Sequence, residues 1–106
     1  MKVARLREVA RRDVEDIVDD YASEGGAALA LRFVGAFERT LRLIARHPAA
    51  GSPRFGYELG LPGLRTRGLR GFPYLVFYVE RDEVVDVWRV LHGQRDIPAW
   101  LGEPDG

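Results

Sequence analysis

The stretch FPYLVFYVERDEVVDVWRVL, residues 72–91, decides the fold, because it holds two β-prone segments joined by a charged turn. Residues 72–80 are rich in aromatic and β-branched side chains, and Pro73 stands at the start, where its missing N–H does least harm. The ERDE segment at 80–83 is typical of a tight hairpin turn. Residues 84–91 complete the pattern, so we expect a β-hairpin here.

The last strand of this hairpin contains a conflict. Strict alternation places Arg89 on the same face as Val85 and Val87, where a guanidinium is costly unless it is paired. A β-bulge near Trp88 would exchange the faces, turning Arg89 outward and Val90 inward. We favour the bulge, and a paired, inward Arg89 stays as the alternative.

Two more strands are expected before the hairpin. Residues 2–7 alternate between polar and apolar side chains and predict a short strand. Residues 64–69 also alternate, with Arg65 and Arg67 on one face and Leu64 on the other.

Between these strands the sequence predicts two helices. Residues 9–23 place apolar side chains at helical spacing, and the EGG segment at 24–26 ends this helix. Residues 27–46 form a second, more apolar helix that Pro48 stops. The short link makes the two helices an antiparallel hairpin.

The expected fold class is α+β, in the order β-α-α-β-β-β, with the helical hairpin on one face of a four-stranded, mainly antiparallel sheet. Residues 48–63 are expected to form a Pro/Gly loop, and residues 96–101 one helical turn before a frayed tail within 97–106. Chain direction predicts a first strand antiparallel to the second and fourth, and either could be its neighbour.

Face assignment leads to a candidate surface. Leu75, Phe77 and Val79 suit the covered face of the sheet, which would leave Tyr74 and Tyr78 on the open face with Arg65 and Arg67. Arginines interleaved with tyrosines suit RNA binding or a protein interface.

Composition narrows the function. A chain of 106 residues is expected to form a single domain, 1–106, and the absence of cysteine with only two histidines predicts no metal site. No segment is apolar enough for a membrane span or a signal peptide, so we expect a cytoplasmic protein without a cofactor or membrane partner. The net charge is zero, yet no acidic residue occurs between Leu59 and Val79, where three arginines lie.

The sequence resembles the RelE/ParE superfamily of bacterial toxins. The resemblance runs from Val3 to about Asp96 and rests on ARRDVEDIVDDYASEGG at the start of the helical hairpin, on FPYLVFYVE, and on VVDVWRVLHGQRD. The spacing of Arg70, Phe72 and the YLVFY segment, together with RVLHGQRD, favours the ParE-like branch.

This resemblance implies a small toxin blocked by a cognate, ParD-like antitoxin whose C-terminal segment wraps around it. ParE-like members poison DNA gyrase by binding. RelE-like members cut ribosome-bound mRNA, and because both branches share one fold, the fold does not decide between them. A third interpretation is a non-toxic homologue that only binds the antitoxin.

A nuclease would need a base, an acid and cations around the phosphate. The residues available for these roles are Arg65, Arg67, Arg89 and His92. The only lysine is Lys2 and no tyrosine follows Tyr78, so the C-terminal tyrosine of many RelE-like enzymes is missing. His92 also has a structural interpretation, at the end of a strand. We therefore favour the ParE-like inhibitor without catalytic residues.

An inhibitor needs binding residues. The candidates for target or antitoxin contact are Arg65, Arg67, Arg70, Tyr74, Tyr78, Arg89, Arg95 and Trp100. Arg95 has a simpler interpretation as a local ion pair with Asp96, and Trp100 stands in the final turn.

Overall fold

The computed structural model describes residues 1–94 and 97–101, apart from the side chain of Trp100. Arg95, Asp96 and residues 102–106 lie outside the described part of the chain, and with them the predicted ion pair and tail. The elements in order are β1 (Val3–Leu6), α1 (Glu8–Arg46), the 3-10 turn η1 (Pro48–Ala50), α2 (Arg54–Leu59), β2 (Leu64–Gly68), β3 (Tyr74–Glu80), β4 (Val84–His92) and α3 (Ile97–Leu101).

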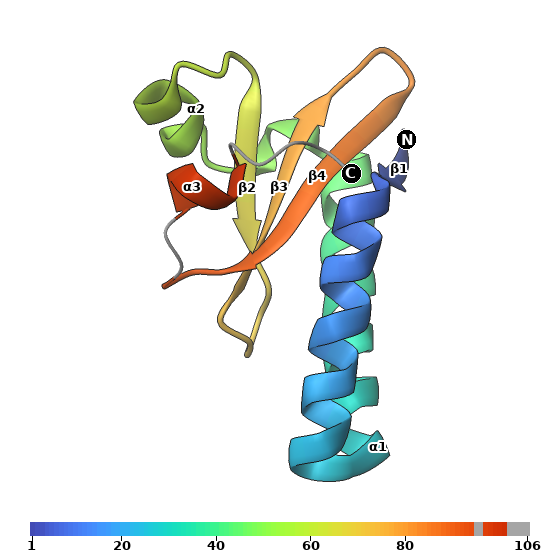
Figure 1. Cartoon of the computed structure of the whole chain (residues 1–106). Coiled ribbons are helices and arrows are strands. Elements are labelled where there is room, and N and C mark those ends of the chain that lie inside the picture. The colour runs from blue at the N-terminus through green and yellow to red at the C-terminus, as the bar shows by residue number, and fades with distance from the viewer. Residues whose placement is uncertain (95–96, 102–106) are drawn as a thin grey trace.

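Helix α1 is the predicted helical hairpin. Its 39 residues fold back on themselves at the far end, so that two helical arms lie side by side (Figure 1). The reversal takes place at Gly26, whose φ of 74° and ψ of −172° are accessible essentially to glycine alone. The glycine pair therefore sets where the hairpin turns.

The sheet has the strand order β1-β4-β3-β2. Strands β2, β3 and β4 form an antiparallel meander, but β1 pairs with β4 in parallel. The prediction of a first strand antiparallel to the second and fourth was wrong. The second arm of the hairpin runs on past the point where the first began, and Ala45 accepts a hydrogen bond from the Lys2 N–H at the start of β1. Strand β2 therefore follows a helix that ends near the start of β1, whereas the prediction assumed that this helix ends where β1 finishes.

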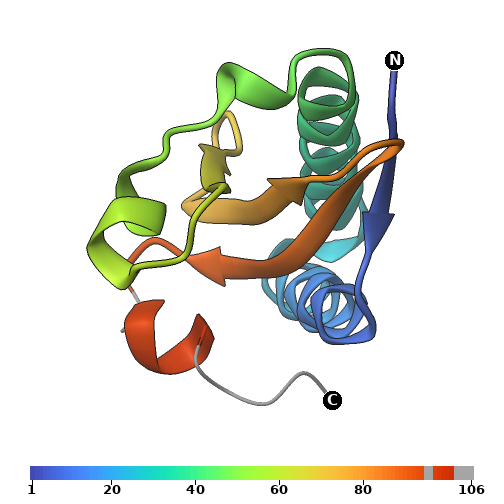
Figure 2. The ribbon, with the colours of Figure 1, turned by 90° about the horizontal axis from the view of Figure 1, so that it is seen from above.

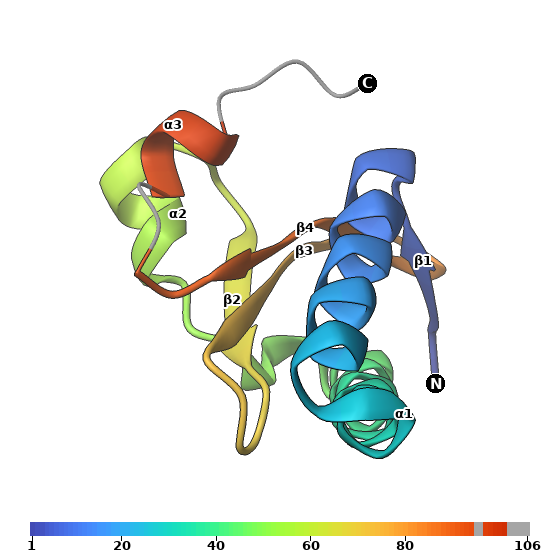
Figure 3. The ribbon, with the colours of Figure 1, turned by 60° about the horizontal axis from the view of Figure 1, so that its bottom comes forward.

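The layers confirm the α+β class, with the hairpin on one face of the sheet (Figure 2). Helices α2 and α3 lie on the other side of the sheet (Figure 3). Residues 48–63 were predicted to be a loop, but they contain η1 and α2. In α2, Arg54 bonds Glu58 one turn later and Phe55 lies against Phe77 of the sheet. Tertiary packing and an ion pair thus make a short helix in a Pro/Gly-rich segment. No helix in the described residues is long and apolar enough to cross a membrane.

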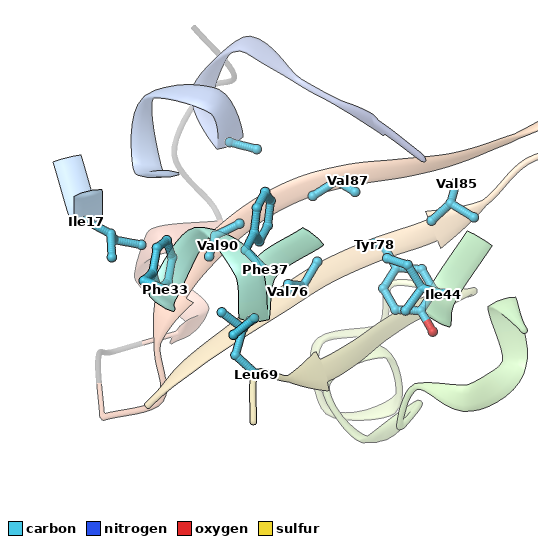
Figure 4. Packing of buried hydrophobic residues seen from close by; sticks show 12 residues of the cluster. Ile17, Phe33, Phe37, Ile44, Leu69, Val76, Tyr78, Val85, Val87 and Val90 are labelled. Carbon is cyan, nitrogen blue, oxygen red and sulfur yellow. The ribbon is translucent and has the colours of Figure 1, made fainter. Parts of the chain in front are cut away.

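The core assigns the faces of β3 in the opposite sense to the prediction. Val76 and Tyr78 point into the hairpin, where they join Phe33, Phe37 and Ile44 (Figure 4). Tyr74 packs against the same cluster. A second cluster on the other face contains Leu64, Phe77, Val79, Leu91 and Ile97, under α2 and α3. The open, tyrosine-bearing face that was predicted therefore does not exist.

The predicted bulge in β4 is confirmed at Trp88. Phe77 faces Arg89 and Tyr78 faces Val87, so Trp88 has no partner on β3. Because of this extra residue, Val87 and Val90 both enter the hairpin core. Arg89 takes the other side of the strand.

Candidate functional site

The outer strand β2 carries the arginines predicted to be functional. Arg65 pairs with Tyr78 and Arg67 with Val76, so both arginines lie on the hairpin side of the sheet, at its edge beside η1. The Arg65 guanidinium donates to the Gly51 carbonyl at 2.8 Å and the Ala49 carbonyl at 3.4 Å. Arg67 donates to the Ala50 carbonyl at 3.3 Å. Main-chain oxygens therefore orient two adjacent arginines.

Tyr78 holds the main-chain segment that orients these arginines. Its hydroxyl accepts a hydrogen bond from the Gly51 N–H at 2.9 Å and donates one to the Pro48 carbonyl at 2.7 Å. Burial raises the pKa of Tyr78, although the Gly51 hydrogen bond and nearby Arg65 oppose this. The approach is so close that a Cβ at Gly51 would lie 2.4 Å from the hydroxyl oxygen. Tyr78 thus fastens the segment after the hairpin to the sheet.

Arg70 extends the same basic surface. It is exposed, and it lines an open hollow together with Arg67, Gly68 and the segment from Ala50 to Ser52. Among the described residues, no carboxylate forms an ion pair with Arg65, Arg67 or Arg70. We call the surface of Arg65, Arg67 and Arg70 the β2 arginine edge.

Arg89 has a different environment. Its side chain is 8% exposed, and its Nε and Nη2 each lie 2.8 Å from a carboxylate oxygen of Asp13 on α1. Asp13 also accepts the main-chain N–H of Val90 at 3.0 Å, on the part of β4 that extends beyond β1. The bulge turns Arg89 away from the hairpin core, as favoured from the sequence, but its side chain is buried and paired with Asp13, so the expectation of an Arg89 on a free face was wrong. The carboxylate on α1 supplies the pairing that the sequence could not show.

His92 ends β4, as expected. Its ring lies edge-on to Tyr74, with centroids 5.3 Å apart, and its Nδ1 accepts the Gln94 N–H at 3.1 Å. The small hollow beside it is lined by acidic residues of α1, including Asp16 and Asp20. Such surroundings would repel a phosphate from this imidazole.

The four residues available for a nuclease are not brought together. Arg65 and Arg67 lie at the β2 edge, Arg89 is neutralised by Asp13 across the sheet, and His92 faces carboxylates. No group of three or more potential metal ligands occurs in the part of the chain that the structure describes.

Sequence reasoning did not single out Asp13. Its position carried a signal: Asp13 stands four residues before buried Ile17, and therefore on the inward stripe. An inward aspartate and an arginine in an otherwise apolar strand each need a partner. These two requirements together could have predicted the ion pair between Asp13 and Arg89.

Comparisons with known proteins agree with the geometry. Residues 4–97 match the family described as ParE toxin of type II toxin-antitoxin system, parDE. A solved structure of the chromosomal ParDE TA system from P. aeruginosa shares the fold, with a TM-score of 0.73 and 21% sequence identity. The similarity covers 87% of this chain and 96% of that one. No curated protein matches the chain.

Proposed function

Because this chain belongs to the ParE toxin family of type II toxin–antitoxin systems, we propose that it acts by binding DNA gyrase in the cytoplasm and that a cognate ParD-like antitoxin neutralises it. The family match over residues 4–97 carries this proposal. It fits the arrangement of polar groups, since the residues that could serve an RNA-cleaving site lie in separate environments.

Gyrase and mRNA can be separated by one pair of assays. Purified toxin is added to a gyrase supercoiling reaction and, separately, to a translating extract whose mRNA is mapped by primer extension. We expect inhibited supercoiling and intact mRNA. Cut mRNA with unaffected supercoiling would contradict the proposal and favour the ribonuclease.

A His92→Ala variant gives a second test. An imidazole that serves proton transfer contributes about 10²–10⁴-fold to rate, so a ribonuclease would lose most of its toxicity. A gyrase inhibitor would retain it, because His92 contacts Tyr74 and the Gln94 N–H. The variant is to be compared with the parent at equal expression and with its fold checked by circular dichroism.

For the antitoxin, we propose the groove between β1 and the second arm of α1. Strand β1 forms one edge of the sheet, and Val3 on it is 63% exposed. The groove beside it is lined by Leu41 and Ala45, with Glu38 and Arg42 at its rim. An apolar floor, a charged rim and a strand edge suit an extended antitoxin segment.

The antitoxin contact is tested by co-purification of the pair encoded together. A Val3→Asp change would place an unpaired charge in the contact and should release the antitoxin. Leu31→Asp is the matched control, because Leu31 is 68% exposed on α1 and does not line the groove. Equal retention of antitoxin by both variants would contradict this assignment.

A further inference from the structure

The β2 arginine edge keeps its full positive charge. The guanidinium groups of Arg65 and Arg67 bond to carbonyl oxygens, which orient a cation without neutralising it. At the start of α1 and in α2, by contrast, arginines bond to carboxylates one helical turn away, as in the contacts of Arg11 with Glu15 and of Arg54 with Glu58. The β2 arginine edge therefore presents oriented cations that can bind an anion.

The hollow at this edge is unsuited to a protein partner. Apart from the arginines, its lining consists of small residues from Ala50 to Ser52, Thr66, Gly68, and Leu69, which is only 6% exposed. Protein interfaces draw most of their energy from large side chains that enter pockets. Here the partner would meet oriented arginines and small residues, which suit a phosphate group better than an apolar anchor.

The hollow lined by Arg67 and Arg70 is also unsuited to single-stranded nucleic acid, since its lining residues include no aromatic ring and the exposed Tyr57 lines a different hollow. Binding of unpaired bases needs exposed aromatic rings on which they stack. The two tyrosines that share this side of the sheet are unavailable, because Tyr78 is fully buried and Tyr74 packs against Phe33 and Tyr21. A duplex presents phosphates without requiring such rings.

We propose that the β2 arginine edge binds the sugar–phosphate backbone of duplex DNA, with Arg67 and Arg70 as the main contacts and Arg65 as a partly buried support. The choice of DNA rests on the proposed function, since gyrase presents duplex DNA to whatever binds beside it. Each phosphate contact adds affinity that is independent of sequence and that falls with salt.

The test measures DNA binding by the purified toxin alone, so that it stays distinct from gyrase inhibition. A fluorescent duplex of mixed sequence is titrated with toxin at several salt concentrations from 50 to 200 mM. The fluorescence anisotropy is measured, and the Kd is obtained from its change. For non-specific contacts we expect a Kd of about 10⁻⁴–10⁻⁶ M near physiological salt. The Arg67→Gln, Arg70→Gln double variant should lower the slope of log affinity against log salt by about 2.

Two control variants define the outcome. Arg32→Gln with Arg39→Gln removes two exposed arginines from α1, and therefore the same net charge, and should leave the slope unchanged. Arg67→Lys with Arg70→Lys keeps the charge and should retain most of the binding. If the parent does not bind the duplex, or if the α1 control weakens binding as much as the edge variant, the proposal is wrong.

Two further arms identify a competing ligand. Single-stranded RNA of equal length that binds more tightly than the duplex would overturn the proposal in favour of RNA. An edge variant that loses its antitoxin in co-purification, while its DNA affinity is unchanged, would assign the edge to an acidic protein segment. Normal edge-dependent DNA binding with no effect of the toxin on supercoiling would support this surface and contradict the gyrase target.

Discussion

Arg89 on β4 and Arg67 on β2 belong to one sheet and have opposite roles. Arg89 is buried and bonds both oxygens of Asp13, while Arg67 is exposed and bonds the Ala50 carbonyl. A buried arginine that pairs with a carboxylate stabilises the fold. An exposed arginine that does not pair with a carboxylate can bind a ligand. Between these extremes stands Arg7, which is 34% exposed, bonds Asp86 and lies over the Trp88 ring. The type of partner, more than the presence of arginine, separates structure from function.

Removing the carboxylate beside Arg89 should have the largest effect. Asp13→Ala removes the carboxylate that bonds the buried Arg89 guanidinium and frees the Val90 N–H, so we expect the free energy of unfolding to fall by about 3–5 kcal/mol. Urea denaturation checks this value.

The double variant Asp13→Leu, Arg89→Met sharpens the same comparison. Since it removes both charges, it should be more stable than Asp13→Ala alone. A double variant that is no more stable than the single one would show that Arg89 is not the residue that needs Asp13.

Tyr78→Phe should have the next largest effect. The change leaves the Gly51 N–H and the Pro48 carbonyl without their partner, at a cost of about 1–3 kcal/mol. It should also weaken DNA binding, because the carbonyls that orient Arg65 and Arg67 are released. Tyr57→Phe is the control: this ring is 82% exposed, and its variant should stay within about 0.5 kcal/mol of the parent.

The ion pair of Arg7 with Asp86 should affect the free energy of unfolding at acidic pH. Burial alone would raise the pKa of Asp86, but hydrogen bonds from Arg7 and Trp88 outweigh it and hold the pKa below its usual value of 3.8. Because the folded state then binds the proton less readily than the unfolded state, this stabilisation is present above about pH 4 and is lost as the pH falls. Asp86→Asn should therefore flatten the decline of unfolding free energy below pH 4, measured in urea from pH 7 to 2.5. A parallel decline in both proteins would refute this.

The smallest effect on stability is expected for the exposed Arg67. Arg67→Gln removes one hydrogen bond to an exposed segment and should change the free energy of unfolding by less than about 0.5 kcal/mol. A loss above 1 kcal/mol in thermal or urea unfolding would mean that Arg67 supports the fold, and would weaken its assignment to a ligand.

The sequence predicted elements better than faces. The bulge at Trp88 was predictable because strict alternation in β4 would put Arg89 on the same face as Val85 and Val87. In β3 every residue from Tyr74 to Val79 is apolar or aromatic, so period-two patterning carried no information about which side faces the hairpin. Which side of β3 faces the hairpin depends on the short helices α2 and α3, which cover the second face of the sheet.

The candidate site was predictable in composition and not in geometry. Absence of acidic residues from Leu59 to Val79 indicated a basic surface, and the exposed Arg67 and Arg70 are on it. The carbonyls that orient Arg65 and Arg67 are main-chain atoms, which leave no trace in residue type. The partner of Arg89 stands 76 residues away on a helix, beyond the reach of local pattern.

The parallel pairing of β1 with β4 has a consequence for how the molecule assembles during synthesis. Among the charge pairs that join the N-terminal region to the β3–β4 hairpin, Arg7 with Asp86 and Asp13 with Arg89 link residues 79 and 76 positions apart. The helical hairpin can form early from local contacts, but β1 must wait for the last strand to leave the ribosome. A nascent chain therefore holds its helices without a closed sheet, and the β2 arginine edge gains its oriented form once β3, which carries Tyr78, has been made.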